Sequence, residues 1–283
     1  MNKTLRNIIY CMLACFVLLT SCDKVDDNNR LIFAGAAGKW VEGQGVEDHS
    51  QRVFLEKYTG AKCTNCPRAD KVIAEALNKY GNKLIAVSIH DSSYFCKPYP
   101  GSIDLRTEDG NTWSTVMGMK DAEKPMALIN RNKTGEAFTQ YQPTSNMDDI
   151  FDAELANNSV IAIDVDAAME NGSMNIDVNL EFLQEVANPL TLTVLIIEDG
   201  LITTQLDNGV TDTHYVNNHI LRDVITDVWG ADVDADGHTG TKRFCRFTYQ
   251  PNGAWILNNC HIVAVISDKS TRHIINSAET GIK

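Results

Sequence analysis

The sequence predicts an α/β domain followed by an all-β domain. Three observations support this prediction: strand-like and helix-like segments alternate before residue 158, the helical period disappears after it, and turn residues then separate short alternating runs. A length of 283 residues favours two folded domains over one. We expect these domains at residues 52–157 and 158–283, after a leader at 1–21 and an acidic N-terminal segment at 22–51.

The first 21 residues are predicted to be an export signal. Lys3 and Arg6 precede an apolar run, Ile8 to Leu19, which is too short to span a bilayer because a spanning helix needs about twenty residues. The following Thr20-Ser21-Cys22 completes a pattern that resembles the lipobox of bacterial lipoprotein precursors. The resemblance implies cleavage before Cys22, acylation of that cysteine with a chain such as palmitate, and a lipid anchor. An ordinary signal peptide is the alternative.

The chain after the predicted cleavage site is acidic. Removal of residues 1–21 leaves 23 basic against 37 acidic residues, a net charge of −14 without the histidines. This balance argues against a nucleic-acid partner and against electrostatic docking to anionic lipids. Residues 23–29 are polar and charged, so we expect a tether behind the anchor. Acidic residues at this place also resemble the surface-export signal of some outer-membrane lipoproteins, and the membrane face, periplasmic or cell-surface, stays open.

The first domain is predicted from a β-α-β order around two cysteines. Arg52 to Tyr58 and Lys83 to Ile89 are apolar runs typical of buried strands, and Pro67 to Tyr80 has apolar residues at helical spacing. Helices are expected at 111–118 and 146–157, with a hairpin between them that begins with the strand Met126 to Asn130.

Cys63 and Cys66 lie between the first strand and the first helix, in the motif Cys-Thr-Asn-Cys. Main-chain N–H groups and the dipole at the start of a helix stabilise a thiolate and lower the pKa of the first cysteine below about 8.5. Cys63 is therefore the candidate nucleophile and Cys66 the resolving thiol. Strand, motif and helix together resemble the thioredoxin superfamily, which implies that Pro125, just before a later strand, is a cis-proline facing the motif.

The motif departs from thioredoxin in its central Thr-Asn pair and in the absence of a tryptophan before Cys63. Glu56 is a candidate for the buried proton-relay acid, although it lies one residue further from the cysteine than that fold usually places it. A carboxylate at the surface or at a strand edge is the alternative for Glu56.

A loop of about twenty residues follows His90, and loops of this length are often functional. Tyr94, Phe95 and Tyr99 are candidates for an apolar lid beside the Cys-Thr-Asn-Cys motif, with Cys96 as a third participating thiol. Alternatively, the aromatic side chains pack the loop against the domain and Cys96 is inert.

The second domain is predicted to be an immunoglobulin-like β-sandwich, because short strands separated by Asn, Gly, Asp and Pro fill about 125 residues. The expected strands are Val160 to Ala167, Met174 to Phe182, Leu190 to Glu198, Tyr215 to Ile225, Lys242 to Gln250, Trp255 to Ser267 and Arg272 to Ser277. Cys245 and Cys260 flank the turn at 251–253, which favours either a cross-strand disulfide or two separate buried thiols. The fold class is thus an α/β thioredoxin-like domain followed by an all-β immunoglobulin-like sandwich.

No metal or cofactor is predicted. The first positions of an EF-hand calcium loop are matched by Asp232, Asp234 and Asp236. The twelfth position, which should be a bidentate Glu, is Arg243, and this favours a solvated acidic turn. Two weaker metal-binding sets are considered and disfavoured, namely His214 and His219 with Asp212 and Asp223, and Cys63 and Cys66 with His90 and Cys96.

Several segments together resemble the outer-membrane lipoprotein family named for a twenty-eight-kilodalton outer-membrane protein. They are Glu56-Lys-Tyr-Thr-Gly, Cys63-Thr-Asn-Cys66-Pro-Arg, Ala86-Val-Ser-Ile-His90, Leu105-Arg-Thr-Glu-Asp-Gly-Asn111, Asn130-Arg131 and Asn217-Asn-His219-Ile-Leu-Arg222. The resemblance implies the two-domain architecture and an outer-membrane address, without an established activity.

Two functions are therefore predicted as alternatives. The first is thiol-disulfide exchange on exported proteins through Cys63 and Cys66, with Pro125 shaping the peptide groove. The second is a surface binding or adhesion module in which the disulfide is only structural. Solvent access to the sulfur of Cys63 discriminates between them, because an exchange enzyme needs that sulfur open.

Overall fold

The structure is a computed structural model that describes residues 36–37 and 39–283. The described residues form one compact unit. The predicted signal segment and the lipidation site Cys22 lie outside the described residues. The predicted division after residue 157 stays a prediction.

A central sheet contains strands from both halves of the chain. Its order is β17-β16-β10-β13-β4-β3-β5, with β14 beside β10. The bounds are β3 Val53–Tyr58, β4 Leu84–Ile89, β5 Met126–Ile129, β10 Leu190–Glu198, β13 Ile220–Val224, β14 Ala231–Asp232, β16 Cys260–Asp268 and β17 Ile274–Gly281. The two halves of the sequence are joined by a parallel pairing of β13 with β4, in which Ile220 lies opposite Ser88.

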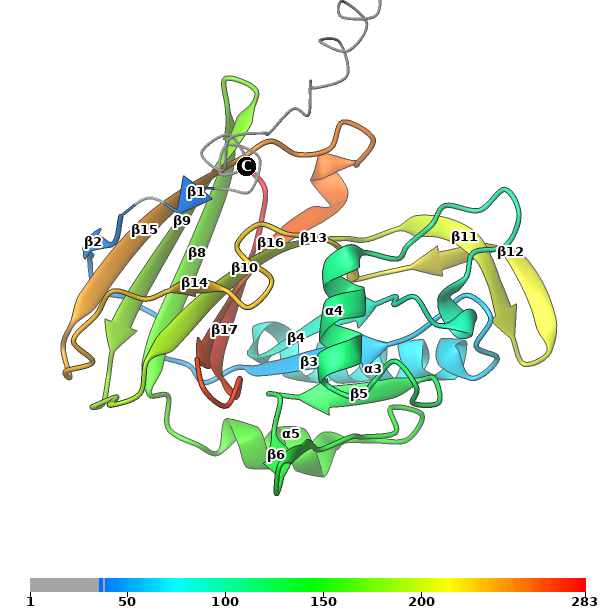
Figure 1. Cartoon of the computed structure of the whole chain (residues 1–283), viewed down its shortest axis with the longest axis horizontal. Coiled ribbons are helices and arrows are strands. Elements are labelled where there is room, and N and C mark those ends of the chain that lie inside the picture. The colour runs from blue at the N-terminus through cyan, green and yellow to red at the C-terminus, as the bar shows by residue number, and fades with distance from the viewer. Residues whose placement is uncertain (1–35, 38) are drawn as a thin grey trace, which may run out of the picture. The chain divides into compact units, whose positions relative to one another are not determined.

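The β-α-β order of the first half is confirmed. Strands β3 and β4 are parallel and connected by α3 (Cys66–Tyr80), and all their residues are buried, as expected of strands covered on both faces. Helices α3 and α5 (Asp148–Leu155) cover one face of these strands, and α4 (Glu108–Val116) covers the other (Figure 1).

Strand β10 is buried throughout because it separates two cores. Alternate side chains of a strand point to opposite faces. Leu192, Val194 and Ile196 therefore join the core between the two large sheets, whereas Leu195 and Ile197 join the cluster beneath Trp113 of α4.

A second sheet packs against strands β10, β16 and β17 of the central sheet. It contains β8 (Ile161–Glu170), β9 (Ser173–Phe182) and β15 (Lys242–Tyr249), with the short strands β1 (Ala36–Ala37) and β2 (Val41–Glu42) along β15. Every second residue of β9 is buried, which matches the predicted alternation. The two sheets share one apolar core, and an immunoglobulin-like connectivity for them stays a prediction.

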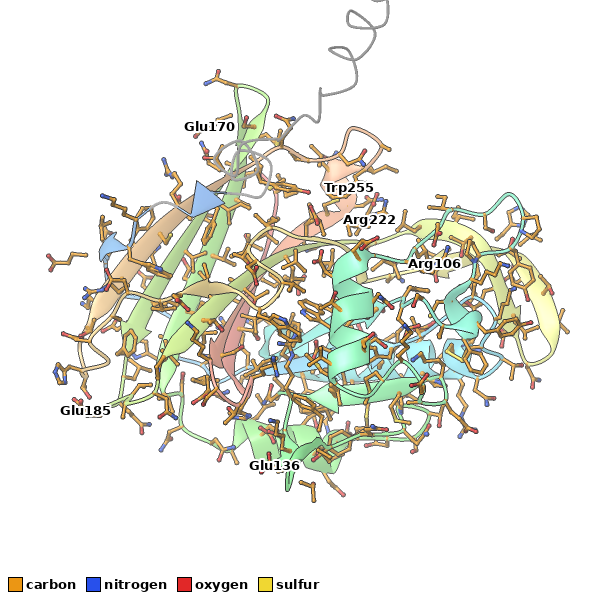
Figure 2. The ribbon with its side chains drawn as sticks, in the orientation of Figure 1. Arg106, Glu136, Glu170, Glu185, Arg222 and Trp255 are labelled. Atoms are coloured by element: carbon orange, nitrogen blue, oxygen red, sulfur yellow. A yellow bond between two sulfur atoms is a disulfide. The ribbon has the colours of Figure 1, made fainter. Side chains whose placement is uncertain are left out.

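Two hairpins lie outside the large sheets. One is β6 (Lys133–Thr134) with β7 (Ala137–Phe138), and the other is β11 (Leu201–Asp207) with β12 (Val210–Asn217). The single strand predicted for Tyr215 to Ile225 is wrong: β12 ends at Asn217, His219 has φ of 58°, and β13 begins at Ile220. Beyond this break Arg222 of β13 lies 5.4 Å from the ring of Trp255 (Figure 2).

Candidate functional site

Cys63 and Cys66 form a disulfide at the start of α3. Their Cα atoms are 5.4 Å apart, within the range for disulfides. Strand β3 delivers the chain to the motif, and Cys66 is the first residue of the helix. Both cysteines are 1 % exposed, whereas Thr64 and Asn65 between them are exposed. The sulfur atoms are thus withdrawn from solvent although the loop that carries them reaches the surface.

The loop after β4 packs closely against the turn before the disulfide. The N–H of Lys62 donates to the carbonyl of Phe95 at 2.8 Å. A Cβ atom on Gly60 would lie 2.5 Å from the same carbonyl oxygen, so only glycine allows this approach. Tyr94 is 73 % exposed, and the ammonium of Lys62 lies 4.7 Å from its ring centroid. The loop is therefore attached to the turn by the main chain of Phe95 and by the contact of Lys62 with Tyr94, and an apolar lid of the three aromatic residues stays a prediction.

The hairpin of β11 and β12 reaches the same turn from the second half of the sequence (Figure 1). The N–H of Leu206 donates to the carbonyl of Ala61 at 2.8 Å, and the N–H of Asn208 donates to the carbonyl of Thr64 at 3.0 Å. The N–H of Gly209 donates to Oγ1 of Thr64 at 2.8 Å. The tip of the hairpin is thus bound by main-chain hydrogen bonds to the Cys-Thr-Asn-Cys loop.

Side chains add to this contact. The amide nitrogen of Gln205, a residue 3 % exposed, donates to the carbonyl oxygens of Gly60 at 3.1 Å and Cys63 at 3.0 Å. The hydroxyl of Tyr215 donates to Asp70 of α3 at 2.6 Å, and Asp70 also pairs with Lys57 of β3. Burial and the nearby Asp70 carboxylate raise the pKa of Tyr215, so its hydroxyl stays protonated as a donor.

Pro125 stands directly before β5 and follows a cis peptide bond from Lys124, as the resemblance to the thioredoxin superfamily implies. The ammonium of Lys124 is fully buried 3.0 Å from a carboxylate oxygen of Asp91. Burial disfavours the charged form of Asp91, but hydrogen bonds from Ser114 and Ser93 and the charge of Lys124 outweigh it and lower its pKa to about 2. A buried ion pair therefore fixes the segment that carries Pro125.

Glu56 is neither a surface nor a strand-edge carboxylate, so that alternative is wrong. It is 0 % exposed and accepts two hydrogen bonds from Arg131, at 2.9 Å from Nε and 2.8 Å from Nη2. The guanidinium carbon of Arg131 lies 4.9 Å from the ring centroid of Trp113. Arg131 comes from the turn after β5, where Asn130 and Arg131 have φ of 47° and 50°. Because its two oxygens are held by Arg131, Glu56 forms a structural ion pair in this state.

Residues 117–283, more than half of the chain, match the family model described as outer membrane protein Omp28. The chain belongs to the Omp28 family. It is accordingly an outer-membrane protein. No described helix is long and apolar enough to cross a membrane.

Several solved structures are similar to this Omp28-family chain. HBP35 of Porphyromonas gingivalis has a TM-score of 0.65 at 16% identity, covering 83% of this chain and 76% of that one. A protein of Agrobacterium tumefaciens has a TM-score of 0.49 at 14% identity and covers 82% and 95%, respectively. A domain of the outer membrane lipoprotein Omp28 from Porphyromonas gingivalis has a TM-score of 0.31 at 16% identity and covers 44% and 89%. A search of curated proteins gives no match.

Cys96 is a buried thiol in the Omp28-family chain, 2 % exposed. Its Sγ lies 2.9 Å from the carbonyl oxygen of Thr59 and 3.1 Å from Oδ1 of Asp91. Burial and the Asp91 charge raise its pKa to about 12, which favours the thiol over the reactive thiolate. This arrangement favours the alternative in which Cys96 is inert and attaches the loop to the turn after β3.

The predicted disulfide between Cys245 and Cys260 is wrong. Cys245 lies on β15 opposite Val178 of β9, and Cys260 lies on β16 opposite Glu198 of β10. The two cysteines belong to different sheets and not to one hairpin, and Cys260 has a free, buried thiol. Two separate buried cysteines were the alternative, and the structure has that arrangement.

The candidate metal ligands have other partners. Asp232 pairs with Lys269, Asp236 accepts from Thr241 at 2.6 Å, and the carbonyl of Asp234 accepts from Arg243. Among residues 39–283 no three or more His, Cys, Asp or Glu side chains gather in a way that could hold a metal ion. The second set is dispersed as well, because Asp212 accepts from the N–H of His214, His219 lies near Asp199, and Asp223 accepts from Tyr249.

The sequence interpretation missed the hairpin that covers the disulfide. A signal was present: Asn208-Gly209 is a pair typical of two-residue hairpin turns, and both residues have positive φ, 46° and 83°. The covered face of β11 gives no such signal, because its buried residues Thr203 and Gln205 are polar whereas Ile202 on the other face is exposed.

Proposed function

We propose that this chain is a lipid-anchored outer-membrane binding protein in which a thioredoxin-like unit carries a structural disulfide. The cover over Cys63 and Cys66 is the observation that carries the proposal. A disulfide that exchanges must admit a second sulfur along the S–S axis. Both cysteines are 1 % exposed, and Gln205, Leu206 and the hairpin turn are bonded to the loop that holds them.

The thioredoxin-like assignment is supported by local geometry. The elements follow one another in the order strand β3, the Cys63–Cys66 disulfide at the start of α3, strand β4 and strand β5. Strand β4 is parallel to β3, and β5 is antiparallel to it. The cis bond before Pro125 lies at the start of β5. In this unit the disulfide fixes the first turn of α3 to the end of β3, which is the structural role that we assign to it.

The lipid anchor is supported by the pattern that ends in Cys22. Cleavage before Cys22 and acylation of this residue would tether the acidic chain to the membrane without a spanning helix. Metabolic labelling with an alkyne analogue of palmitate tests this. Labelled protein is expected for the natural chain and none for Cys22→Ser, whereas equal labelling would exclude Cys22 as the anchor.

A partner surface is supported by the outward face of the hairpin. Ile202 and Val216 are a cross-strand pair, 56 % and 50 % exposed, and Val210 at the turn is 70 % exposed. Apolar side chains gathered on one exposed ribbon are typical of protein-binding surfaces. We assign this face to an exported or surface protein as partner.

Thiol-disulfide exchange is the second candidate, favoured by the position of the cysteines at a helix N-terminus. In that reaction the Cys63 thiolate of the reduced protein attacks a substrate disulfide and releases one substrate thiolate. The Cys66 thiolate then attacks the mixed disulfide, which re-forms Cys63–Cys66 and releases the second substrate thiolate. The substrate gains two electrons and the protein loses two. The hairpin would have to leave the Cys-Thr-Asn-Cys loop first.

The reduction potential of the Cys63–Cys66 pair tests the proposal. The purified chain is equilibrated in glutathione buffers, and its thiols are trapped and counted by mass. A structural disulfide is expected to have a potential below about −300 mV. A potential above about −230 mV together with a mixed disulfide trapped by Cys66→Ser would overturn the structural role and establish exchange.

A further inference from the structure

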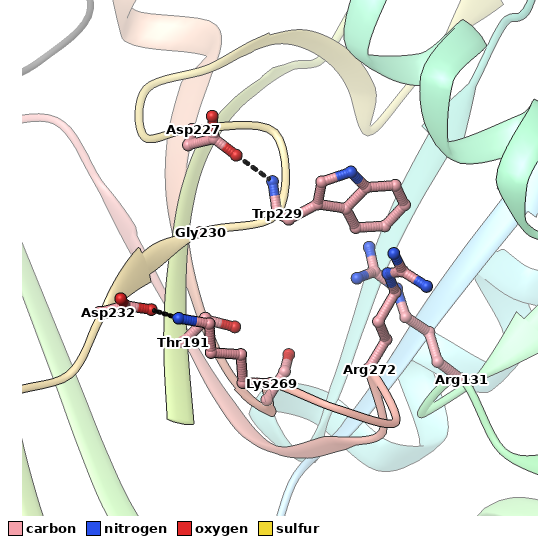
Figure 3. Close-up of a pocket in the computed structure, with 9 residues that line it drawn as sticks. Arg131, Thr191, Asp227, Trp229, Gly230, Asp232, Lys269 and Arg272 are labelled. Atoms are coloured by element: carbon pink, nitrogen blue, oxygen red, sulfur yellow. Dashed lines mark hydrogen bonds and ion pairs between the residues drawn. The ribbon is translucent and has the colours of Figure 1, made fainter. Parts of the chain in front are cut away.

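We propose that a cavity between Trp229, Arg131 and Arg272 binds a small ligand through its carboxylate group. The cavity has a volume of about 360 Å³, which is within the range of small-molecule sites (Figure 3). None of its lining residues belongs to the Cys63–Cys66 loop or to the β11–β12 hairpin. The inference therefore goes beyond the proposed function and does not depend on it.

Two guanidinium groups provide the recognition. Arg272 stacks on Trp229, with its guanidinium carbon 4.1 Å from the ring centroid, and has no hydrogen bond or ion pair from its guanidinium within residues 39–283. Arg131 uses Nε and Nη2 for Glu56, which leaves Nη1 as a donor. Figure 3 shows both arginine side chains pointing toward Trp229. The guanidinium of Arg272, which has no acidic partner in the described residues, lies beside the guanidinium of Arg131. Together the two groups can bind a carboxylate.

Backbone strain is concentrated at the same cavity. Arg131 has φ of 50° and Arg272 has φ of 64°, both in the left-handed region that long side chains rarely adopt. Two of the lining residues are therefore held in an unfavourable conformation, and both deliver a guanidinium to the cavity. Strain of this kind clusters at ligand-binding sites, where it positions the side chains in advance.

A buried hydroxyl lacks a partner in this cavity. Ser267 lines it and is 3 % exposed, and its Oγ has no hydrogen bond in the described part of the chain. An unpaired buried hydroxyl costs free energy unless a ligand or water satisfies it. As a donor it would bond to a carboxylate oxygen, which fits the charge provided by Arg272.

The acidic residues of the cavity limit the ligand to a single negative charge. Asp232 is paired with Lys269 at 2.6 Å, and Asp227 accepts from the N–H of Trp229 at 3.0 Å. These two carboxylates would repel a dianionic phosphate more strongly than a monoanion. The face of Trp229 offers an apolar wall for the body of the ligand, such as a sugar ring or a peptide backbone.

Binding to the purified chain is measured by calorimetry with two carboxylate probes, glucuronate and an N-acetylated dipeptide, and with their methyl esters. We expect at least one of the two acids to bind and its methyl ester not to bind. Binding of glucuronate would identify the ligand as an acidic sugar, and binding of the dipeptide would identify it as a peptide C-terminus. Absence of binding by both acids up to about 10 mM would overturn the proposal. Equal binding of acid and ester, or binding of inorganic phosphate alone, would overturn it too.

Two variants locate the site. Arg272→Asn removes the guanidinium while asparagine tolerates the positive φ, and Ser267→Ala removes the unpaired hydroxyl without a change of shape. Each is expected to weaken binding about tenfold or more, whereas Arg68→Asn, at an exposed arginine of α3, is expected to leave it unchanged. Circular dichroism checks that each variant is folded. Undiminished binding by folded Arg272→Asn would refute the site.

Discussion

The side-chain amide nitrogen of Gln205 lies 3.0 Å from the carbonyl oxygen of Cys63, a residue 142 positions earlier in the chain. The same nitrogen donates to the carbonyl of Gly60 at 3.1 Å. These two carbonyls also accept from the N–H groups of Cys63 and Cys66, so Gln205 adds a second donor to each and stabilises the turn before the disulfide. The hairpin and the loop that holds the disulfide are therefore in direct contact, although they lie far apart in the sequence.

We expect Gln205→Ala to expose the disulfide to reductants. The substitution removes two hydrogen bonds to main-chain carbonyls, each worth about 0.5–1.5 kcal/mol, so it should lower the free energy of unfolding by about 1–3 kcal/mol. It should also raise the rate at which dithiothreitol reduces Cys63–Cys66 in the folded chain, because opening of the hairpin becomes easier. Thiol trapping over time measures this rate. Thr211→Ala, at an exposed position of β12, is the control and should reduce at the natural rate. Equal rates for Gln205→Ala and the natural chain would show that the hairpin does not protect the disulfide.

The Asp91–Lys124 pair should make stability depend on pH in the acid range. The pKa of Asp91 is about 2 in the folded chain, below the ordinary value of 3.8. A carboxylate with a depressed pKa contributes stability that is present above the unfolded value, and this contribution disappears as the pH falls through the folded value. We therefore expect about 2 kcal/mol from Asp91 to be lost between about pH 4 and pH 2.

Asp91→Asn isolates this contribution. At pH 6 the variant leaves the buried Lys124 ammonium without a counter-charge and should be about 3–5 kcal/mol less stable than the natural chain. The difference should shrink as the pH falls from about 4 to about 2, as measured by urea unfolding at each pH. Asp121→Asn, at an exposed aspartate, should track the natural chain throughout. A difference that stays constant with pH would contradict the prediction.

The helices and strands of the first half could be predicted because their pattern of apolar and polar residues is visible in the sequence. Strands β3 and β4 are short apolar runs, α3 has apolar residues at helical spacing, and Cys66-Pro67 begins it. The cis-proline was also predicted, but through a resemblance and not from spacing. Local pattern and family resemblance together therefore give the β-α-β unit and the position of its disulfide.

Contacts between distant segments could not be predicted. Strand β13 joins β4 through a single register pair, and no local pattern specifies which edge a strand will choose. Glu56 reads as an ordinary strand residue until Arg131 is placed beside it by a turn with positive φ. The cover over the disulfide depends on Gln205, which has no periodic or motif signal of its own. The function of the Cys63–Cys66 pair therefore depends on tertiary packing.

Removal of the charge on Glu56 should destabilise the fold strongly. Glu56→Gln keeps the shape of the side chain but leaves the guanidinium of Arg131, which is 4 % exposed, without its counter-charge. Breaking a buried ion pair in this way costs about 3–5 kcal/mol. Glu75→Gln, at an exposed glutamate of α3, should change the free energy of unfolding by less than about 0.5 kcal/mol. Urea unfolding measures both, and equal effects would show that the Glu56–Arg131 pair contributes little.

The buried thiols should resist alkylation while the chain is folded. Burial and nearby carboxylates raise the pKa of Cys96 and of Cys260 to about 12, and the thiolate is the form that reacts. Iodoacetamide at pH 8 is therefore expected to leave both residues unlabelled in buffer and to label both in concentrated denaturant, as read by peptide mass spectrometry. A thiol introduced at the exposed hairpin position by Thr211→Cys provides the reactive reference. Labelling of Cys96 in the folded chain at the rate of that reference would contradict the prediction. It would mean that the loop after β4 opens and exposes the thiol of Cys96 to solvent.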